Sequence, residues 1–199
     1  MRPHIPVTNP AAPLDAGQAR GGPLRPCLVV IGGLPGVGKT TVCREVLGLR
    51  PMTWLRIDSI EQALRESGEM RPGTPGGAGY AAAAAVSRDV LATGGDVLAE
   101  CVNPMPLTRR LWEATAGDLG CAFLGVELVC SDAGEHRRRV EGRASDIKGL
   151  VLPDWREVRT RDYEPWPEAG LRLDTARLPP AGAAGRIIRA LSTLLGAGP

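Results

Sequence analysis

The chain alternates short apolar runs with stretches in which apolar residues recur every three or four positions. The runs are rich in β-branched and aliphatic residues, which predicts strands, and they lie at 27–31, 53–57, 96–102, 122–130 and 171–174. The stretches have helical spacing and lie at 39–47, 59–65, 80–92, 106–116, 132–143 and 183–195. Continuous apolar strands that alternate with helices predict an α/β fold, with one parallel sheet covered by helices on both faces.

Three regions lack such a pattern. Residues 1–26 are rich in Pro, Gly and Ala and predict a disordered leader, which leaves 27–199 as a single domain. Residues 68–79 contain too much Gly and Pro for a regular element. Residues 144–170 show no clear element, and we expect the substrate-covering lid within about 132–170.

Composition narrows the class of protein. A chain of 199 residues with a net charge of +2 fits one domain, and this charge is too small to indicate a nucleic-acid partner. No apolar run reaches the roughly 20 residues that a membrane-spanning helix needs. The five cysteines form no C-x-x-C pair and most lie in apolar or helical segments, which favours buried thiols and a cytoplasmic location.

A phosphate-binding loop is the strongest motif in the sequence. Residues 33–40 match G-x-x-x-x-G-K-[ST], directly after an apolar strand and directly before a helix. Glycines allow the backbone N–H groups to approach phosphate oxygens, Lys39 reaches the β- and γ-phosphates, and the hydroxyl of Thr40 is a ligand for Mg²⁺. The predicted nucleotide-binding residues are Gly33, Gly36, Val37, Gly38, Lys39, Thr40 and Thr41.

Two other classes of nucleotide-binding protein fit the sequence less well. A GTPase needs an N-K-x-D element, which is absent, and the D-x-x-G at 146–149 does not follow a predicted strand. A mechanical ATPase usually has adjacent acidic residues at the end of an apolar strand, whereas the strand at 96–102 ends with Glu100 alone. A small kinase is therefore favoured.

Asp58 is the candidate catalytic base. It lies at the carboxyl end of the predicted strand 53–57, where parallel sheets bind ligands. A carboxylate there would accept the proton of an attacking hydroxyl. The alternative is a cap for the helix at 59–65, because Asp58 and Glu61 have capping-box spacing.

Basic residues gather on the predicted helix at 132–143, at whose start Asp132 and Glu135 have capping-box spacing. Helical spacing puts His136, Arg139 and Arg143 on one face, where the arginines would stabilise the transferred phosphoryl group. The alternative is a solvent-exposed basic face paired with Glu135 and Glu141.

The segments IGGLPGVGKTTV, WLRIDSIEQAL, VLAECVNP and VCSDAGEHRRRVEGR resemble small bacterial P-loop kinases, the AAA-type ATPases of the chloramphenicol phosphotransferase-like and zeta-toxin-like group. The resemblance covers roughly residues 27–195. It implies a kinase-type three-layer sandwich with a five-stranded parallel sheet of order 2-3-1-4-5, an arginine-bearing lid, ATP and Mg²⁺.

By position, the resemblance also assigns site residues. It implies Asp58 as the base, and Arg139 and Arg143 as lid arginines, with Arg138 a further candidate. Relatives commonly have aspartate where this chain has Glu100, which would hold a Mg²⁺-bound water or a substrate hydroxyl. Asn103 would contact the substrate or serve as a turn residue before Pro104.

The sequence thus predicts transfer of the γ-phosphoryl group of ATP to a hydroxyl of a small molecule, by a monomer or homodimer. The resemblance suggests an antibiotic, nucleoside or sugar as acceptor, with self-resistance as one role. Trp155 and Trp166 are candidate stacking surfaces because their surroundings are polar. Two alternatives are an ATP-binding regulator without an acceptor and a nucleic-acid 5′-hydroxyl kinase, which would need a broader basic surface.

Overall fold

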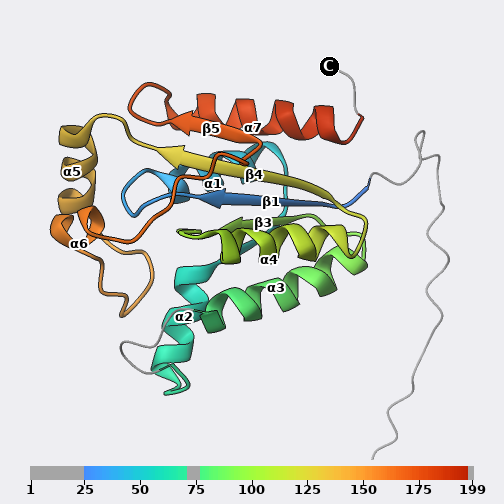
Figure 1. Cartoon of the computed structure of the whole chain (residues 1–199), viewed down its shortest axis with the longest axis horizontal. Coiled ribbons are helices and arrows are strands. Elements are labelled where there is room, and N and C mark those ends of the chain that lie inside the picture. Colours follow the sequence, from blue (N-terminus) through green and yellow to red (C-terminus); the bar gives the residue numbers. More distant parts are fainter. Residues whose placement is uncertain (1–24, 71–76, 197–199) are drawn as a thin grey trace, which may run out of the picture.

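A five-stranded parallel sheet forms the centre of the computed structural model, which describes residues 25–70 and 77–196 (Figure 1). The strands are β1 (Cys27–Gly32), β2 (Thr53–Arg56), β3 (Val97–Glu100), β4 (Ala122–Val129) and β5 (Leu171–Asp174). Their order across the sheet is β2-β3-β1-β4-β5, and every neighbouring pair is parallel. The predicted fold class and strand order are confirmed.

Helices cover both faces of this sheet. They are α1 (Lys39–Leu49), α2 (Ile57–Glu66), α3 (Gly77–Ala92), α4 (Pro106–Gly117), α5 (Ala133–Gly142), α6 (Trp155–Arg159) and α7 (Pro180–Leu194). α1 and α7 pack together over one face, and α3 and α4 pack over the other. Figure 1 shows α5 and α6 together at one end of the molecule, with α2 at the same end.

β1 explains the continuous apolar pattern of the sequence. Its residues Cys27–Ile31 are completely buried. Cys27, Val29 and Ile31 belong to the core beneath α1 and α7, whereas Leu28 and Val30 belong to the core beneath α3 and α4. Successive side chains of a strand point to opposite faces, so a sheet covered on both faces requires apolar residues at every position.

The start of α2 differs from the prediction. The helix begins at Ile57 with Arg56 as its N-cap residue, and no side chain caps it. Asp58 therefore lies in the first turn and does not form the predicted capping box with Glu61. The capping alternative for Asp58 was wrong, and its carboxylate is left to face the site.

Residues predicted to be irregular include parts of two helices. Gly77–Gly79 begin α3, although glycine is a poor helix former. A Cβ on Gly79 would lie 2.5 Å from the Cγ of Glu61 on α2, so the glycine permits a close helix contact that overrides its low propensity. The short α6 lies in the region without a predicted element, and Asp154 and Glu157 form a capping box at its start.

Segment 160–166 is held against the sheet by one buried carboxylate. Glu127 of β4 accepts hydrogen bonds from Tyr163 Oη (2.8 Å), the backbone N of Trp166 (3.1 Å) and Arg172 Nε (2.9 Å). Trp166 is only 1% exposed, so the prediction that it offers a stacking surface was wrong. Of the segment around it, the Tyr163 hydroxyl binds Glu127 and the carbonyl of Pro165 accepts a hydrogen bond from Arg109, so the indole ring is turned into the core.

Two further predictions concern the limits of the chain and its surroundings. The predicted leader at 1–26 lies outside the described residues except for Arg25 and Pro26. Within 25–70 and 77–196, no helix has the length and apolar character needed to cross a membrane.

Replacing Gly125 by Ala tests the packing of Trp166. A Cβ at Gly125 would lie 2.6 Å from the buried indole ring, which has no space to move. We expect Gly125→Ala to lower the free energy of unfolding by about 1–3 kcal/mol through overpacking, measured by urea denaturation. Gly117→Ala is the control, because no heavy atom lies within 4 Å of its Cβ position. Equal stability of the two variants would contradict this packing.

Candidate active site

The phosphate-binding loop connects β1 to α1 and is shaped by glycines. The backbone N of Gly33 donates to the carbonyl of Val102 after β3 (3.0 Å), which fixes the start of the loop. Gly36 has a φ of 84°, and a Cβ there would lie 2.5 Å from the Cγ2 of Val140 on α5. Gly38 is the N-cap residue of α1. The loop therefore leaves its backbone N–H groups at the positive end of a helix dipole.

Lys39 folds back over this loop. Its Nζ donates to the carbonyls of Gly33 (2.8 Å) and Leu34 (3.0 Å). Burial lowers the pKa of Lys39, while the nearby carboxylates of Asp58 and Glu100 raise it. The ammonium group consequently lies over the phosphate-binding position, with two acidic groups close enough to influence its charge.

Thr40 and Glu100 form the acidic side of the site. The hydroxyl of Thr40 donates to Glu100 Oε1 (2.5 Å). The other carboxylate oxygen, Oε2, is buried without a hydrogen-bond partner in the described part of the chain. Arg56 Nε lies 3.4 Å from this oxygen and forms an ion pair with it. A hydroxyl and a carboxylate oxygen without a hydrogen bond match the oxygen ligands that Mg²⁺ prefers, directly or through water. The longer side chain of glutamate thus reaches Thr40 without difficulty.

Asp58 faces the same space from α2. Its side chain is exposed and makes no hydrogen bond to any other residue within 25–70 or 77–196. It lines the same cavity as Lys39 and Arg143, and its negative charge raises the pKa of both. A carboxylate in this position is free to accept a proton from a bound molecule.

α5 brings the basic residues to the loop. Asp132 caps the helix as predicted, accepting a hydrogen bond from the backbone N of Glu135 (2.9 Å). His136 is buried and its Nε2 donates to the carbonyl of Pro35 in the phosphate loop (2.8 Å). The edge of its ring contacts Trp155 of α6. His136 therefore connects α5 and α6 to the loop and is not a surface residue.

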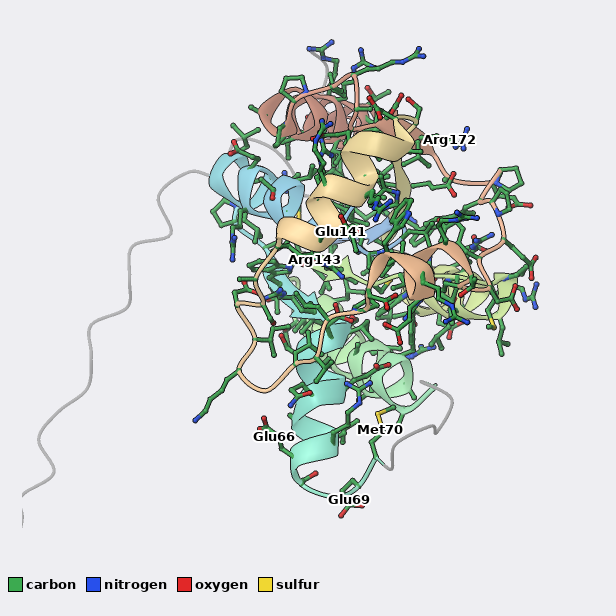
Figure 2. The ribbon with its side chains drawn as sticks, turned by 90° about the vertical axis from the view of Figure 1, so that its left-hand side faces the viewer. Glu66, Glu69, Met70, Glu141, Arg143 and Arg172 are labelled. Carbon is green, nitrogen blue, oxygen red and sulfur yellow. The ribbon has the colours of Figure 1, made fainter. Side chains whose placement is uncertain are left out.

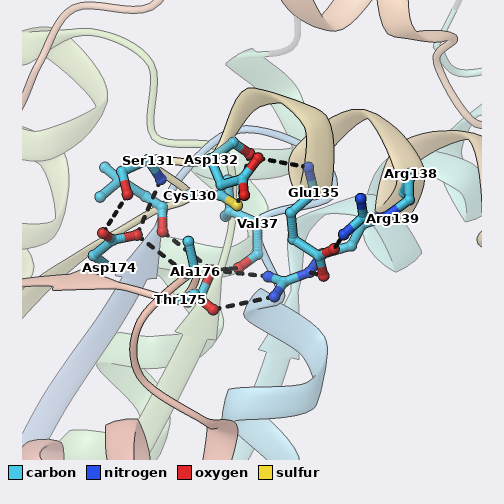
Figure 3. A network of polar contacts seen from close by, with 11 residues as sticks. Val37, Cys130, Ser131, Asp132, Glu135, Arg138, Arg139, Asp174, Thr175 and Ala176 are labelled. Carbon is cyan, nitrogen blue, oxygen red and sulfur yellow. Dashed lines mark hydrogen bonds and ion pairs between the residues drawn. The ribbon is translucent and has the colours of Figure 1, made fainter.

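Arg139 is bound on two sides. Its Nε donates to Glu135 Oε1 (2.7 Å), and its Nη atoms donate to the hydroxyl and carbonyl of Thr175 (3.0 and 3.1 Å). The Thr175 hydroxyl in turn donates to the carbonyl of Val37 (2.9 Å). Figure 3 shows this network joining α5, the end of β5 and the phosphate loop.

Arg143 lies just beyond the last residue of α5 and lacks such partners. Its Nε and Nη2 atoms are buried, and neither has a hydrogen-bond partner among the residues that the structure describes. Burial lowers the pKa of this guanidinium, and Asp58 raises it. Figure 2 shows Arg143 near the middle of the face that α5, α6 and α2 share. An unsatisfied guanidinium at this point is suited to bind an anion.

A cavity of about 1000 Å³ joins these groups. Its lining includes ten of the predicted residues: Gly36, Gly38, Lys39, Thr40, Thr41, Asp58, Glu100, Arg138, Arg139 and Arg143. A smaller cavity of about 230 Å³ lies beside it, lined by Gly38, Thr41, Val42, Arg139, Thr175 and Pro180. The two cavities share Gly38, Thr41 and Arg139.

Some predicted residues lie outside these cavities. Val37 is buried beneath the loop and contributes its carbonyl to Thr175. The Asn103 side chain is completely buried, with neither amide atom hydrogen-bonded among the described residues, and the backbone has a φ of 54°. Asn103 thus adopts the left-handed conformation of a turn, and its contact with a substrate remains a prediction.

Other residues of the site were not predicted. Arg56 ends β2 and pairs in register with Glu100 of β3, and Thr175 directly follows β5. The general position of ligands at the carboxyl ends of parallel strands is a signal that would have indicated both. Asp146, in the region without a predicted element, gave no such signal.

Comparison with known proteins agrees with this architecture. A sequence profile described as an AAA domain matches residues 28–160. No curated protein matches the chain in sequence. Among solved structures, a putative kinase from Chloroflexus aurantiacus is 17% identical with a TM-score of 0.68, covering 86% of this chain and 99% of its own.

Two further structures show the same fold. The APS kinase CysC of Mycobacterium tuberculosis, in complex with AMPPNP and APS, is 21% identical with a TM-score of 0.64, covering 85% of this chain and 99% of its own. Kti12 of Chaetomium thermophilum, in complex with ADP-AlF3, is 19% identical with a TM-score of 0.58, covering 82% and 98%. With the profile matching two thirds of its residues and its sheet in the order of a P-loop kinase, this chain belongs to the AAA domain family.

Proposed function

We propose that this chain is an ATP-dependent phosphotransferase that moves the γ-phosphoryl group to a hydroxyl of a small molecule. The observation that carries the proposal is the free carboxylate of Asp58, in one cavity with Lys39, the Thr40–Glu100 pair and Arg143. A protein that only binds ATP needs the loop but not a poised base. The similarity in fold to a kinase observed with AMPPNP and APS supports the same class of reaction.

The phosphate loop and two cations would bind the triphosphate. Backbone N–H groups of the loop hold the phosphates, and Lys39 exchanges its two carbonyl partners for phosphate oxygens. Arg143, whose guanidinium has two unsatisfied N–H groups, stabilises the charge that spreads over the transferred phosphoryl group. Lys39, Asp58 and Arg143 line one cavity, and the charge of Asp58 raises the pKa of both basic groups.

The pair Thr40 and Glu100 would hold Mg²⁺. The hydroxyl of Thr40 would be one ligand, and Glu100 would bind the ion or its water through Oε2, the oxygen without a hydrogen bond. When bound, the ion neutralises the phosphate oxygens and supports the in-line geometry of transfer.

The smaller cavity would receive the nucleoside. It adjoins the phosphate cavity at Gly38 and Thr41. A nucleotide needs such a connection, because its ribose is joined to the α-phosphate. Arg139 lines it with a guanidinium that Glu135 and Thr175 hold in place, a planar group suited to stack on a base. We therefore assign Arg139 to the nucleoside and Arg143 to the transferred group, where the sequence alone had grouped both with catalysis.

The acceptor would lie between α2 and the segment that follows α5. Asp58 orients the hydroxyl and accepts its proton as it attacks the γ-phosphorus. Beyond Asp58 the cavity is lined by Glu61, Gln62 and Arg65 of the same helix, which offer hydrogen bonds to a polar molecule. An antibiotic, a nucleoside or a sugar with several hydroxyl groups fits this lining.

The first experiment measures ATP consumption with Mg²⁺ against a panel of nucleosides, sugars, aminoglycosides and other hydroxylated antibiotics, and a 5′-hydroxyl oligonucleotide. Mass spectrometry of each acceptor identifies the product. A small molecule that gains one phosphoryl group supports the proposal. Phosphorylation of the oligonucleotide alone would indicate the nucleic-acid kinase instead, and ATP binding without any product would favour the regulator.

Asp58→Asn separates binding from chemistry. We expect the variant to bind ATP with the affinity of the wild type, because the phosphate loop is unchanged. Its turnover is expected to fall by about 100-fold or more, the usual effect of losing a general base. Asp118→Asn is the matched control, since Asp118 pairs with Arg88 on the surface and does not line the cavity. A fully active Asp58→Asn variant would exclude Asp58 as the base.

Arg143→Gln tests the role of the unpaired guanidinium. Because Arg143 acts on charge that develops during transfer, we expect kcat to fall by roughly 100-fold while the Kd for ATP changes little. Arg137→Gln is the control on the same helix, since Arg137 is exposed, pairs with Glu141 and does not line the cavity. Equal kinetics for the two variants would assign α5 a purely structural basic face.

Thr175→Val tests the link between Arg139 and the phosphate loop. The substitution keeps the shape of the side chain but removes the donor to Val37 and the acceptor for Arg139. We expect the Kd for ATP, measured by isothermal titration calorimetry, to rise about tenfold because a buried carbonyl is left unpaired. Thr175→Ser, which keeps the hydroxyl, is expected to bind nearly as the wild type. The same loss in both variants would rule out the hydroxyl as its cause.

A further inference from the structure

Arg56 contacts two carboxylates that belong to different parts of the molecule. Its Nε lies 3.4 Å from Glu100 Oε2, beside Thr40. Its Nη1 and Nη2 donate to the two oxygens of Asp146 (3.0 and 2.9 Å). One guanidinium therefore joins the metal-binding pair to the segment that connects α5 to α6, residues 143–154, which we call the α5–α6 loop.

The sheet fixes the position of Arg56. It is the last residue of β2 and lies directly opposite Glu100 in the parallel pairing of β2 with β3. Its guanidinium also lies over the ring of Trp54, 5.1 Å from the ring centroid. Its side chain is only 17% exposed. Arg56 thus has little freedom to move. A change in the charge or position of Glu100 therefore affects Asp146, and the reverse.

The α5–α6 loop docks at two points. Asp146 binds both Arg56 and Arg44 of α1, the latter at 2.6 Å. Gly149 lies against α2, where a Cβ would come within 2.8 Å of Gln62 Nε2 and 3.0 Å of Glu66 Oε1. Residues between and beyond these points line the large cavity. The loop therefore closes one side of the cavity while Asp146 is docked.

We propose that Arg56 is a positioning residue that couples docking of the α5–α6 loop to occupation of the Thr40–Glu100 pair by Mg²⁺. The proposal rests on the phosphotransferase function argued above. Arg56 keeps Glu100 beside Thr40 and at the same time holds Asp146. The loop that closes the acceptor site is thus docked when Mg²⁺ occupies the metal site.

The sign of this coupling follows from charge. Glu100 and Asp146 share one guanidinium, so each carboxylate is repelled by the other. A cation beside Glu100 reduces this repulsion and favours the docked position of Asp146. Because linkage is reciprocal, docking of the loop strengthens the binding of Mg²⁺ by the same factor.

Proteolysis at a single exposed lysine can report whether the α5–α6 loop is docked. The chain contains two lysines, Lys39 in the phosphate loop and Lys148 in the α5–α6 loop. Lys39 is buried, whereas Lys148 is exposed between the two docking points. Endoproteinase Lys-C needs several residues around its target in an extended form, so the rate of the cut after Lys148 reports the undocked population.

The experiment compares this rate in the wild type and Asp146→Asn, each with AMP-PNP, in the presence of Mg²⁺ or of EDTA, and without nucleotide. Without nucleotide, we expect Asp146→Asn to be cut about two- to fivefold faster, as for the loss of partly exposed ion pairs. In the wild type, Mg²⁺ with AMP-PNP is expected to slow the cut relative to EDTA. This protection should be lost in Asp146→Asn, and the Mg²⁺ concentration for half-maximal AMP-PNP binding should rise by a similar factor.

Asp118→Asn is the matched control, because Asp118 forms a comparable ion pair with Arg88 at 2.9 Å away from the cavity. Arg56→Gln should reproduce the effects of Asp146→Asn, with circular dichroism as the check of its folding. If it does not fold, the exposed Asp146 still provides the test.

Two outcomes would overturn the coupling. One is an unchanged Lys148 rate in Asp146→Asn, and the other is faster cutting with Mg²⁺ protection fully retained. Either result leaves the phosphotransferase proposal intact, since it depends on Asp58 and the phosphate loop. Failure of the wild type to bind AMP-PNP would instead contradict the proposed function itself.

Discussion

Three parallel strands end side by side in this molecule, and their register decides which charged groups meet. β1 pairs with β3 so that Ile31 lies opposite Glu100, and β2 pairs with β3 so that Arg56 lies opposite the same residue. The phosphate loop begins two residues after Ile31. A shift of one residue in β3 would turn Glu100 to the other face of the sheet and separate it from Thr40. The burial of both faces, which excludes such a shift, therefore also fixes the site.

The charges around the large cavity divide into a paired and an unpaired set. Glu135 with Arg139, Glu61 with Arg65, and Asp146 with Arg44 and Arg56 are bound to one another within the described residues. Asp58 and Arg143 have no hydrogen bond of this kind. Paired groups hold elements in place, whereas unpaired groups at a cavity are available to a ligand. The distinction separates the framework of the site from the groups that would act on substrate.

The sequence predicted the features that depend on local pattern. The strand–loop–helix order around residues 33–40 is one such feature, and the cap of α5 at Asp132 is another. Each depends only on residues that are close together in the sequence. The fold class follows from apolar runs that only a doubly covered sheet explains. Glu100 ends β3 and accepts a hydrogen bond from Thr40, which lies in the first turn of α1 after the neighbouring strand β1. The role of this pair toward Mg²⁺ stays a prediction.

Features that depend on long-range contacts were beyond the sequence. In the sequence, Trp166 lies among polar residues. In the structure, its backbone N and the hydroxyl of Tyr163 bind the buried Glu127, which is 39 and 36 positions away along the chain. In the sequence, Asp146 begins a D-x-x-G pattern, which is an element of GTPases. Only the structure shows its ion pairs with Arg44 and Arg56. Gly77–Gly79 read as a loop until α2 packs against them. In each case the deciding partner is distant in sequence, so no local window contains the information.

The hydrogen bond between His136 and Pro35 has a consequence for how such a protein could be redesigned. It attaches α5 directly to the phosphate loop. The α5–α6 loop is instead held by side-chain contacts at Asp146 and by the absence of a side chain at Gly149. Exchange of this loop, with Arg143, Asp146 and Gly149 retained, would then change the lining of the large cavity while the contacts of the phosphate loop stay the same.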